Sequence, residues 1–199
     1  DADITGPSIP KLFGIHEKAL GNEDGILPCK SKTGIDVMSI NLLLENDTDP
    51  VVWRGPVIAG TVKQFYTDVI WRDVDFMFVD MPPGTGDIQL TLSQQVPLTG
   101  AVVVTTPQDI ALIDAKKGLR MFQKVNVPIL GIIENMSVFI CPHCGEVEHI
   151  FGEGGAKRMS EQYGVPLLGE LPLSAKIREQ ADSGLPTVAA EPDGKEALM

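Results

Sequence analysis

Short apolar runs alternate along the middle of the chain with longer segments in which apolar residues recur every three or four positions. Apolar runs of this length, bounded by turn residues, indicate buried strands of a parallel sheet, and the longer spacing indicates helices that pack on it. The alternation predicts an α/β fold with a doubly wound, mostly parallel sheet and right-handed crossovers. The predicted strands are 76–80, 101–105 and 128–133, and the predicted helices are 58–71, 87–96 and 110–125.

One interval breaks this alternation. Residues 138–150, VFICPHCGEVEHI, contain two short β-like runs around CPHCG, which predicts a hairpin that projects from the sheet. The 199 residues are enough for one well-cored domain, and the chain becomes polar from residue 188. We therefore expect a single domain over 1–187, with the hairpin at 138–150, followed by a polar tail over 188–199.

The segment FMFVDMPPGTGD, residues 76–87, combines an apolar run, a carboxylate and a turn. Its pattern predicts that Asp80 lies at the carboxyl end of a buried strand, where α/β proteins bind ligands, and a carboxylate there can hold hydrated Mg²⁺ through water. Pro82 and Pro83 fix φ and remove two N–H donors, while Gly84 lets the backbone approach a phosphate closely. The segment has the form of a Walker B strand with a γ-phosphate sensor; the alternative is a strand that ends in an ordinary Pro-Gly turn.

Two of the three cysteines form a CxxC motif. Cys141 and Cys144 can point at one metal ion or cluster, but zinc and a [4Fe–4S] cluster each take about four ligands. His143 or His149 can complete the set, or a second chain can supply another pair, which is the economical solution. CPHC also occurs in DsbA-type thiol oxidoreductases, although there an apolar helix follows the motif, and a structural zinc knuckle is a further alternative. Cys29 has no neighbouring ligand residue and is expected to be a plain thiol.

The excess of acidic over basic residues makes some classes of binding partner unfavourable. Sixteen Lys and Arg against 27 Asp and Glu give a formal net charge of -11, which argues against nucleic acid and anionic membranes as partners. The chain contains no apolar run of the roughly 20 residues that span a bilayer, and no signal-like segment at its start. We therefore expect a cytoplasmic protein.

Several long strings in this sequence resemble the Mrp/ApbC family, a group of MinD-like P-loop ATPases that carry iron–sulfur clusters. The resemblance implies an ATP-dependent carrier in which a homodimer holds one [4Fe–4S] cluster between two CxxC pairs, receives it from scaffold proteins and passes it to apo-proteins. ATP, Mg²⁺ and the cluster are the implied ligands. The strings are DADITGPSIPKLFG from residue 1, VVWRGP at 51–56, VDMPPGTGD at 79–87, TTPQDIAL at 105–112 and ENMSVFICPHCG at 134–145.

The resemblance also assigns roles to individual residues. It implies that Asp3 is the switch I carboxylate that orients the attacking water, and that Asp80 is the second catalytic carboxylate, acting through Mg²⁺. Asn135 matches the position that contacts adenine, and Pro172 is expected to line the same base pocket. From the residues alone, Asp3 and Asn135 are equally well explained as turn formers.

The phosphate-binding motif of P-loop enzymes, G-x-x-x-x-G-K-[ST], does not occur in these 199 residues. The glycine-rich string at 152–157 does not qualify, because Arg158 follows its lysine and no buried strand precedes it. The resembling family places this loop before the DAD string, so we expect a chain truncated ahead of that string. Since phosphate positioning supplies nearly all of the catalysis, the chain alone is expected not to hydrolyse ATP.

Overall fold

A computed structural model describes residues 1–46, 51, 53 and 55–198 of the protein. Val52 and Arg54 of the string VVWRGP therefore lie outside the described residues. Contacts divide the chain into two compact units, which are described separately below, and the prediction of one domain over 1–187 stays a prediction. The first unit comprises Asp1–Pro82, Gly86–Val96 and Glu179–Ala190, and the second comprises Pro83–Thr85, Pro97–Arg178 and Glu191–Met199.

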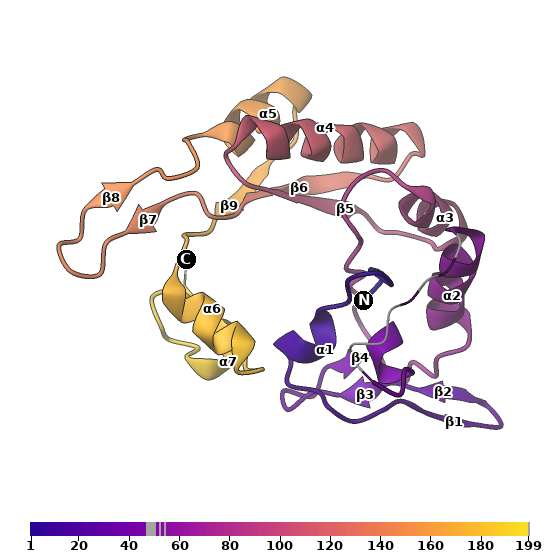
Figure 1. The fold of residues 1–199 in the computed structure, drawn as a ribbon. Helices are drawn as coiled ribbons and strands as arrows, with labels where there is room; N and C mark the ends of the chain where they lie inside the picture. Colours follow the sequence, from indigo (N-terminus) through magenta and orange to yellow (C-terminus); the bar gives the residue numbers. More distant parts are fainter. Residues whose placement is uncertain (47–50, 52, 54, 199) are drawn as a thin grey trace. The chain divides into compact units, whose positions relative to one another are not determined.

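A three-stranded parallel sheet organises the second unit. Its strands β5 (Ala101–Thr105), β6 (Ile129–Glu134) and β9 (Leu167–Glu170) lie in the order β5-β6-β9. Helix α4 (Asp109–Lys124) connects β5 to β6, and helix α5 (Gly155–Tyr163) precedes β9. Both helices lie on the same face of the sheet (Figure 1). The predicted α/β fold with a parallel sheet is thus confirmed, and strand 101–105 has the predicted bounds.

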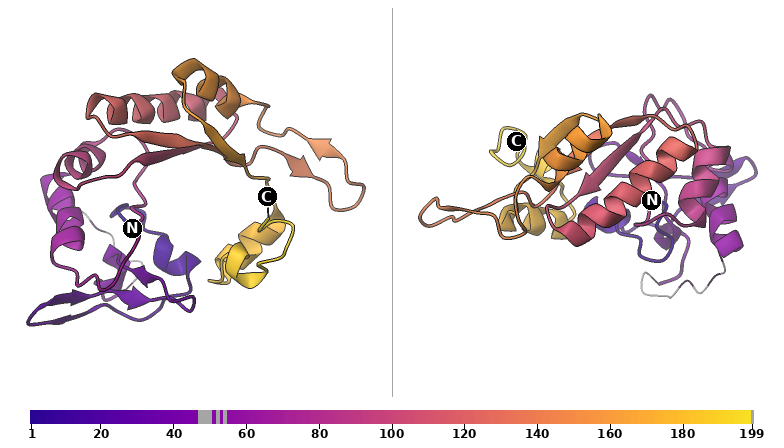
Figure 2. Two further views of the ribbon diagram at one scale, coloured as in Figure 1. Left: turned by 180° about the vertical axis from the view of Figure 1, so that it is seen from behind. Right: turned by 90° about the horizontal axis from the view of Figure 1, so that it is seen from above.

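Burial alternates along β5, and this alternation shows which face of the sheet forms the core. Val103 is 8% exposed, whereas Val102 and Val104 are 43% and 59% exposed. The buried side chains meet α4 and α5, whose positions above the sheet can be followed in Figure 2. Apolar burial of this kind stabilises a domain by roughly 25 cal/mol per Å² of area removed from water. The core of this unit consists of Val103, Leu112, Leu119, Ile132, Ala156 and Met159.

Two glycines show how closely α4 and α5 approach their neighbours. A Cβ atom added to Gly155 would lie 2.8 Å from the backbone oxygen of Pro107 and 2.8 Å from Cδ1 of Leu112. By contrast, a Cβ atom on Gly118, inside α4, would have no neighbour within 4 Å. Only a residue without a side chain fits at the start of α5, while the position in α4 has room for one.

The first unit contains short hairpins and two packed helices. Helix α2 (Gly55–Thr67) contacts helix α3 (Asp87–Gln95). The buried residues of α2 include Ile58, Val62 and Phe65, which belong to the apolar face that the sequence spacing predicts. The elements of the unit that precede α2 are α1 (Ile9–Leu12), β1 (Leu20–Asn22), β2 (Gly25–Leu27), β3 (Cys29–Lys30), β4 (Asp36–Val37) and the 3-10 helix η1 (Ile40–Leu42).

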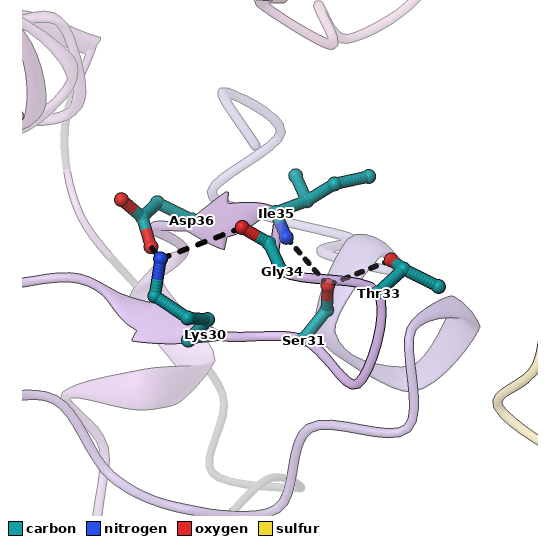
Figure 3. A network of polar contacts seen from close by, with 6 residues as sticks. All are labelled: Lys30, Ser31, Thr33, Gly34, Ile35 and Asp36. Carbon is teal, nitrogen blue, oxygen red and sulfur yellow. Dashed lines mark hydrogen bonds and ion pairs between the residues drawn. The ribbon is translucent and has the colours of Figure 1, made fainter. Parts of the chain in front are cut away.

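Polar contacts close the hairpin between β3 and β4, as Figure 3 shows. Nζ of Lys30 lies 2.7 Å from Oδ1 of Asp36, and the N–H of Ile35 donates to Oγ of Ser31 over 3.0 Å. Cys29, at the start of β3, is 8% exposed and packs in an apolar cluster with Val37. Burial, followed by the negative charge of Glu17, raises the pKa of the Cys29 thiol. The prediction of a plain thiol agrees with this environment.

The predicted buried strand at 76–80 is wrong. The segment forms no strand and belongs to no sheet, and Phe76 and Phe78 are 81% and 90% exposed. A strand needs a neighbour to satisfy its row of N–H and C=O groups. Among the described residues, the backbone oxygen of Asp80 takes part in one such bond, accepting from the N–H of Ala2 over 2.8 Å. The apolar pattern is that of a buried strand, but no partner strand of the described chain lies beside it.

The chain ends in helix α6 (Ala175–Asp182), helix α7 (Thr187–Ala190) and the segment after them. In the second unit, Nζ of Lys176 pairs with the carboxylates of Glu191 and Glu196, so the polar tail contacts the start of α6. None of the helices in the described part of the chain combines the length and apolar character needed to cross a membrane.

Candidate functional site

The two predicted catalytic carboxylates come from neighbouring segments of the first unit. The hydrogen bond between Ala2 and Asp80 places the DAD string beside the end of the 76–80 segment. Oδ1 of Asp3 accepts from the N–H and the hydroxyl of Thr5, over 3.2 and 2.9 Å, and from the N–H of Gly6 over 3.0 Å. Asp3 therefore forms a turn, as one of its two interpretations predicts, while its carboxylate stays at the surface beside the Asp80 segment.

The turn that follows Asp80 is held by a residue that sequence reasoning missed. Gln89, in α3, is 3% exposed, and its side-chain N–H donates to the backbone oxygen of Pro82 over 2.7 Å. Gly84 has φ +92, and a Cβ there would meet no atom within 4 Å. The start of the loop is thus fixed, and its glycine has a backbone conformation that residues with side chains rarely adopt. The Asp80 side chain is exposed, which leaves room for the hydration shell of a Mg²⁺ ion.

Asp1 was also missed, although it stands in the DAD string. Its Oδ2 accepts from the N–H groups of Ser8 and Ile9, over 3.1 and 3.2 Å, and from the hydroxyl of Ser39 over 3.0 Å. The first N–H groups of a helix have no partner within the helix, and a carboxylate there satisfies them. Asp1 thereby fixes the turn that carries Asp3 against the start of α1.

The CxxC motif lies in a hairpin of the second unit, as predicted. Strands β7 (Phe139–Ile140) and β8 (Val147–Glu148) pair antiparallel, and the motif forms the turn between them (Figure 1). Within the turn, the N–H of Gly145 donates to the oxygen of Cys141 over 2.9 Å, and Gly145 has φ +75. Cys141 is half-buried and Cys144 is exposed, and neither forms a disulfide. Both thiols therefore lie at a surface where they can bind a metal centre.

Hydrogen bonds within this turn favour a thiolate. The N–H of Cys144, then the N–H of His143 and the thiol of Cys144, lower the pKa of Cys141. Across the described residues, no three His, Cys, Asp or Glu side chains gather in a way that could hold a metal ion. In this structure His143 and His149 therefore do not form such a group with the two cysteines. Strand β8 follows the motif, in place of the apolar helix of thiol oxidoreductases.

Asn135 and Pro172, the predicted base contacts, lie in adjacent segments of the second unit. Oδ1 of Asn135 accepts from the N–H of Met136 over 2.9 Å, so the side chain forms a turn and its NH₂ group keeps its capacity to donate. The residue before Pro172, Leu171, donates its N–H to the oxygen of Glu134 over 2.8 Å. Both predicted base contacts therefore lie within two residues of the ends of paired strands, β6 and β9.

Glu134, the residue before Asn135, is a further polar residue of this region that sequence reasoning missed. The side chain is 1% exposed at the end of β6, and its Oε2 accepts from the N–H of Ala156 over 2.6 Å. Ala156 is the second residue of α5, whose N-cap, Gly154, has no side chain to serve as a cap. The signal in the sequence was a charged residue at the end of an apolar run, and Asp80 ends such a run too.

Two curated proteins that are similar to this chain have the same description. The chain is 52% identical over 202 residues to an iron-sulfur cluster carrier protein of Pseudomonas fragi, covering 100% of this chain and 70% of that protein. It is 52% identical over 197 residues to the iron-sulfur cluster carrier protein of Escherichia coli K12, covering 98% of this chain and 53% of that protein. The chain thus spans 53% to 70% of the length of these two relatives.

Two solved structures have a fold similar to that of this chain. A nucleotide-binding protein of Archaeoglobus fulgidus, in complex with ADP, matches with a TM-score of 0.81 and 36% identity, over 100% of this chain and 76% of that one. The cell division ATPase MinD of Pyrococcus furiosus matches with a TM-score of 0.65 and 21% identity, over 100% and 79%, which shows a shared fold. The model of ParA, described as NUBPL iron-transfer P-loop NTPase, matches residues 1–199. The protein therefore belongs to this family of P-loop NTPases.

Proposed function

We propose that this protein is an ATP-dependent iron–sulfur cluster carrier that holds a [4Fe–4S] cluster through Cys141 and Cys144 and transfers it to apo-proteins. The observation that carries the proposal is the pair of thiols at the turn of a hairpin, where a partner can reach them. The lowered pKa of Cys141 supports it, because the thiolate is the form that binds iron. The names of the relatives from Pseudomonas fragi and Escherichia coli support it independently.

The number of ligands favours a homodimer. A [4Fe–4S] cluster takes about four thiolates, and each chain offers two in this hairpin. Two chains that meet at their hairpins supply four, and the cluster, which is the cargo, then bridges them. A cargo held at the surface between two chains is released when the chains separate, which suits transfer from a scaffold protein and on to apo-proteins.

The nucleotide side of the proposal rests on two groups of residues. Asp80 would hold Mg²⁺ through water, Asp3 would orient the attacking water, and the turn of Pro82, Pro83 and Gly84 would sense the γ-phosphate. When bound, Mg²⁺ neutralises charge on the phosphates. Asn135 and Pro172 would contact the base, and the ADP complex of the Archaeoglobus fulgidus protein supports such a site.

Cluster assembly in vitro tests the proposal. Purified chain is reconstituted anaerobically with iron and sulfide, then analysed for iron and sulfide per chain and for its size in solution. We expect about four irons per dimer, and loss of that iron in the Cys141→Ala/Cys144→Ala double variant. Transfer is measured as the recovery of activity of an apo [4Fe–4S] enzyme after addition of the loaded protein.

The matched control is Cys29→Ser, which removes the buried thiol and is expected to leave the iron content unchanged. Stoichiometric zinc without cysteine-dependent iron would contradict the carrier function and favour a zinc knuckle that only dimerises. A reversible disulfide between Cys141 and Cys144, with turnover of dithiol substrates and no iron binding, would favour a thiol oxidoreductase.

A further inference from the structure

The pairing between β6 and β9 continues past the end of the sheet. The oxygen of Leu171 accepts from the N–H of Ser137 over 2.9 Å, and the N–H of Leu173 donates to the oxygen of Val138 over 2.8 Å. A parallel bridge then joins Phe139, the first residue of β7, to Leu173. One continuous ladder of backbone hydrogen bonds therefore runs from the sheet to the start of the hairpin that carries Cys141 and Cys144. We call residues 137–139, where this hairpin begins, the hairpin foot.

Ser137 lies in the middle of this ladder and makes two bonds to one atom. Its N–H and its hydroxyl both donate to the oxygen of Leu171, the hydroxyl over 3.0 Å. The residue is 7% exposed. The residue before it, Met136, has φ +54, a left-handed conformation that is unusual for a side chain of this size. The double bond holds the chain after this bend in one position.

The anchors of the hairpin are few. Residues 142–149 are exposed, so the turn and β8 make few contacts beyond their own pairing. Beside the hairpin foot lies a cavity of about 480 Å³, which Ser137, Ile140, His149 and Pro172 help to line. A segment with few packed neighbours and an adjacent cavity has room to move. The orientation of the hairpin thus depends largely on its bonds to residues 171–173.

The same segments contain the two residues proposed to contact the base. Asn135 precedes the left-handed bend, and Pro172 lies between Leu171 and Leu173, which both bond to the hairpin foot. A base that contacts Asn135 and Pro172 would shift or fix both strands of this ladder. No other connection is needed to carry that change to Cys141, three residues beyond Val138.

We propose that Ser137 is a positioning residue that couples adenine nucleotide at Asn135 and Pro172 to the orientation of the cysteine hairpin. This inference rests on one part of the proposed function, the nucleotide site at Asn135 and Pro172. It does not depend on cluster binding. Coupling is reciprocal, so nucleotide would alter the accessibility of the thiols, and a bound cluster would alter the affinity for nucleotide by the same factor.

Thiol labelling of the full chain, without cluster, tests this inference. Alkylation rates of Cys141 and Cys144 with iodoacetamide are measured by mass spectrometry with and without saturating MgADP, with buried Cys29 as the internal reference. We expect MgADP to change the rates by about fivefold or more in the wild type, the lower end of ordinary coupling. Ser137→Ala should bring this ratio close to one while the Kd for MgADP changes less than about threefold, because the backbone bond remains.

Two further variants separate coupling from a general loss of stability. Ser160, in α5, makes the same kind of bond, from its hydroxyl to the backbone oxygen of Val165. Ser160→Ala removes that bond and should keep the wild-type ratio of labelling rates with and without MgADP. Ser137→Thr keeps a hydroxyl and should restore it. The inference is overturned if MgADP does not bind, if it binds without changing the labelling rates, or if Ser137→Ala keeps the ratio. Iron–sulfide reconstitution of the same preparations reports separately on the carrier function, because labelling is done without cluster.

Discussion

Replacement of Glu134 tests whether helix α5 depends on a cap supplied by β6. Leucine at this position has a side chain of similar volume but lacks the oxygen that accepts from the N–H of Ala156. Ala156 is 0% exposed, so water cannot replace that oxygen. A buried N–H without a partner costs about 1–3 kcal/mol. Glutamine keeps an oxygen in the same place, so Glu134→Gln should cost less than about 1 kcal/mol.

The assay is urea unfolding followed by far-UV circular dichroism, together with hydrogen exchange of peptides from α5 by mass spectrometry. Fluorescence is unsuitable, because Trp53 and Trp71 both belong to the first unit. If the free energy of local opening falls by about 1–3 kcal/mol, hydrogen exchange in α5 becomes about 5 to 150 times faster. Glu161→Gln, an exposed change in the same helix, is the control and should leave exchange unchanged.

Equal effects of leucine and glutamine at position 134 would refute this reasoning. The oxygen would then contribute nothing to the start of α5, and the short distance to Ala156 would have no energetic consequence. A glutamine variant less stable than the leucine variant would also refute it, since the order of the two substitutions follows directly from the unpaired N–H.

Three further predictions address other parts of the chain. Gly155→Ala should lower stability by about 1–3 kcal/mol, because its Cβ meets backbone at 2.8 Å, whereas Gly118→Ala should raise it by about 0.5–1 kcal/mol; urea midpoints that fall in both variants would contradict this. Cys29 should be alkylated more slowly than Cys144 in the folded protein and should gain rate only at higher pH, since burial raises its pKa and the thiolate is the reactive form; equal rates at pH 7.5 before unfolding would argue against the buried position. The 199-residue chain alone should release no phosphate from MgATP, and release that Asp80→Asn abolishes would contradict that expectation.

The sequence was a good guide wherever structure depends on neighbours along the chain. The run AVVVT became β5 with the predicted bounds, and helix 110–125 differs from α4 (Asp109–Lys124) by one residue at each end, because apolar spacing and turn residues are local signals. The hairpin around Cys141 and Cys144 was predicted for the same reason. Its two strands flank a turn that Gly145 permits.

Structural features that depend on contacts between residues far apart in the sequence were either missed or predicted wrongly. The segment 76–80 has the composition of a strand, but pairing decides whether a strand forms, and composition does not identify the pairing partner. Glu134 meets Ala156 only through the fold, and the bond from Gln89 to Pro82 likewise joins residues that no periodicity relates. For Asp3, the residues alone permitted both a turn and a catalytic role, and the turn is now visible.

Glu134 also closes the chain segment that contains the hairpin into a loop. Its backbone follows directly into the hairpin, and its carboxylate binds Ala156, where the chain returns to the unit. The entropy lost in closing a loop grows only with the logarithm of its length, by about 0.6 kcal/mol for each doubling. The tip between these two points can therefore lengthen, shorten or exchange its ligands at little cost to the sheet. An engineer could graft a different metal-binding turn here and keep the scaffold intact.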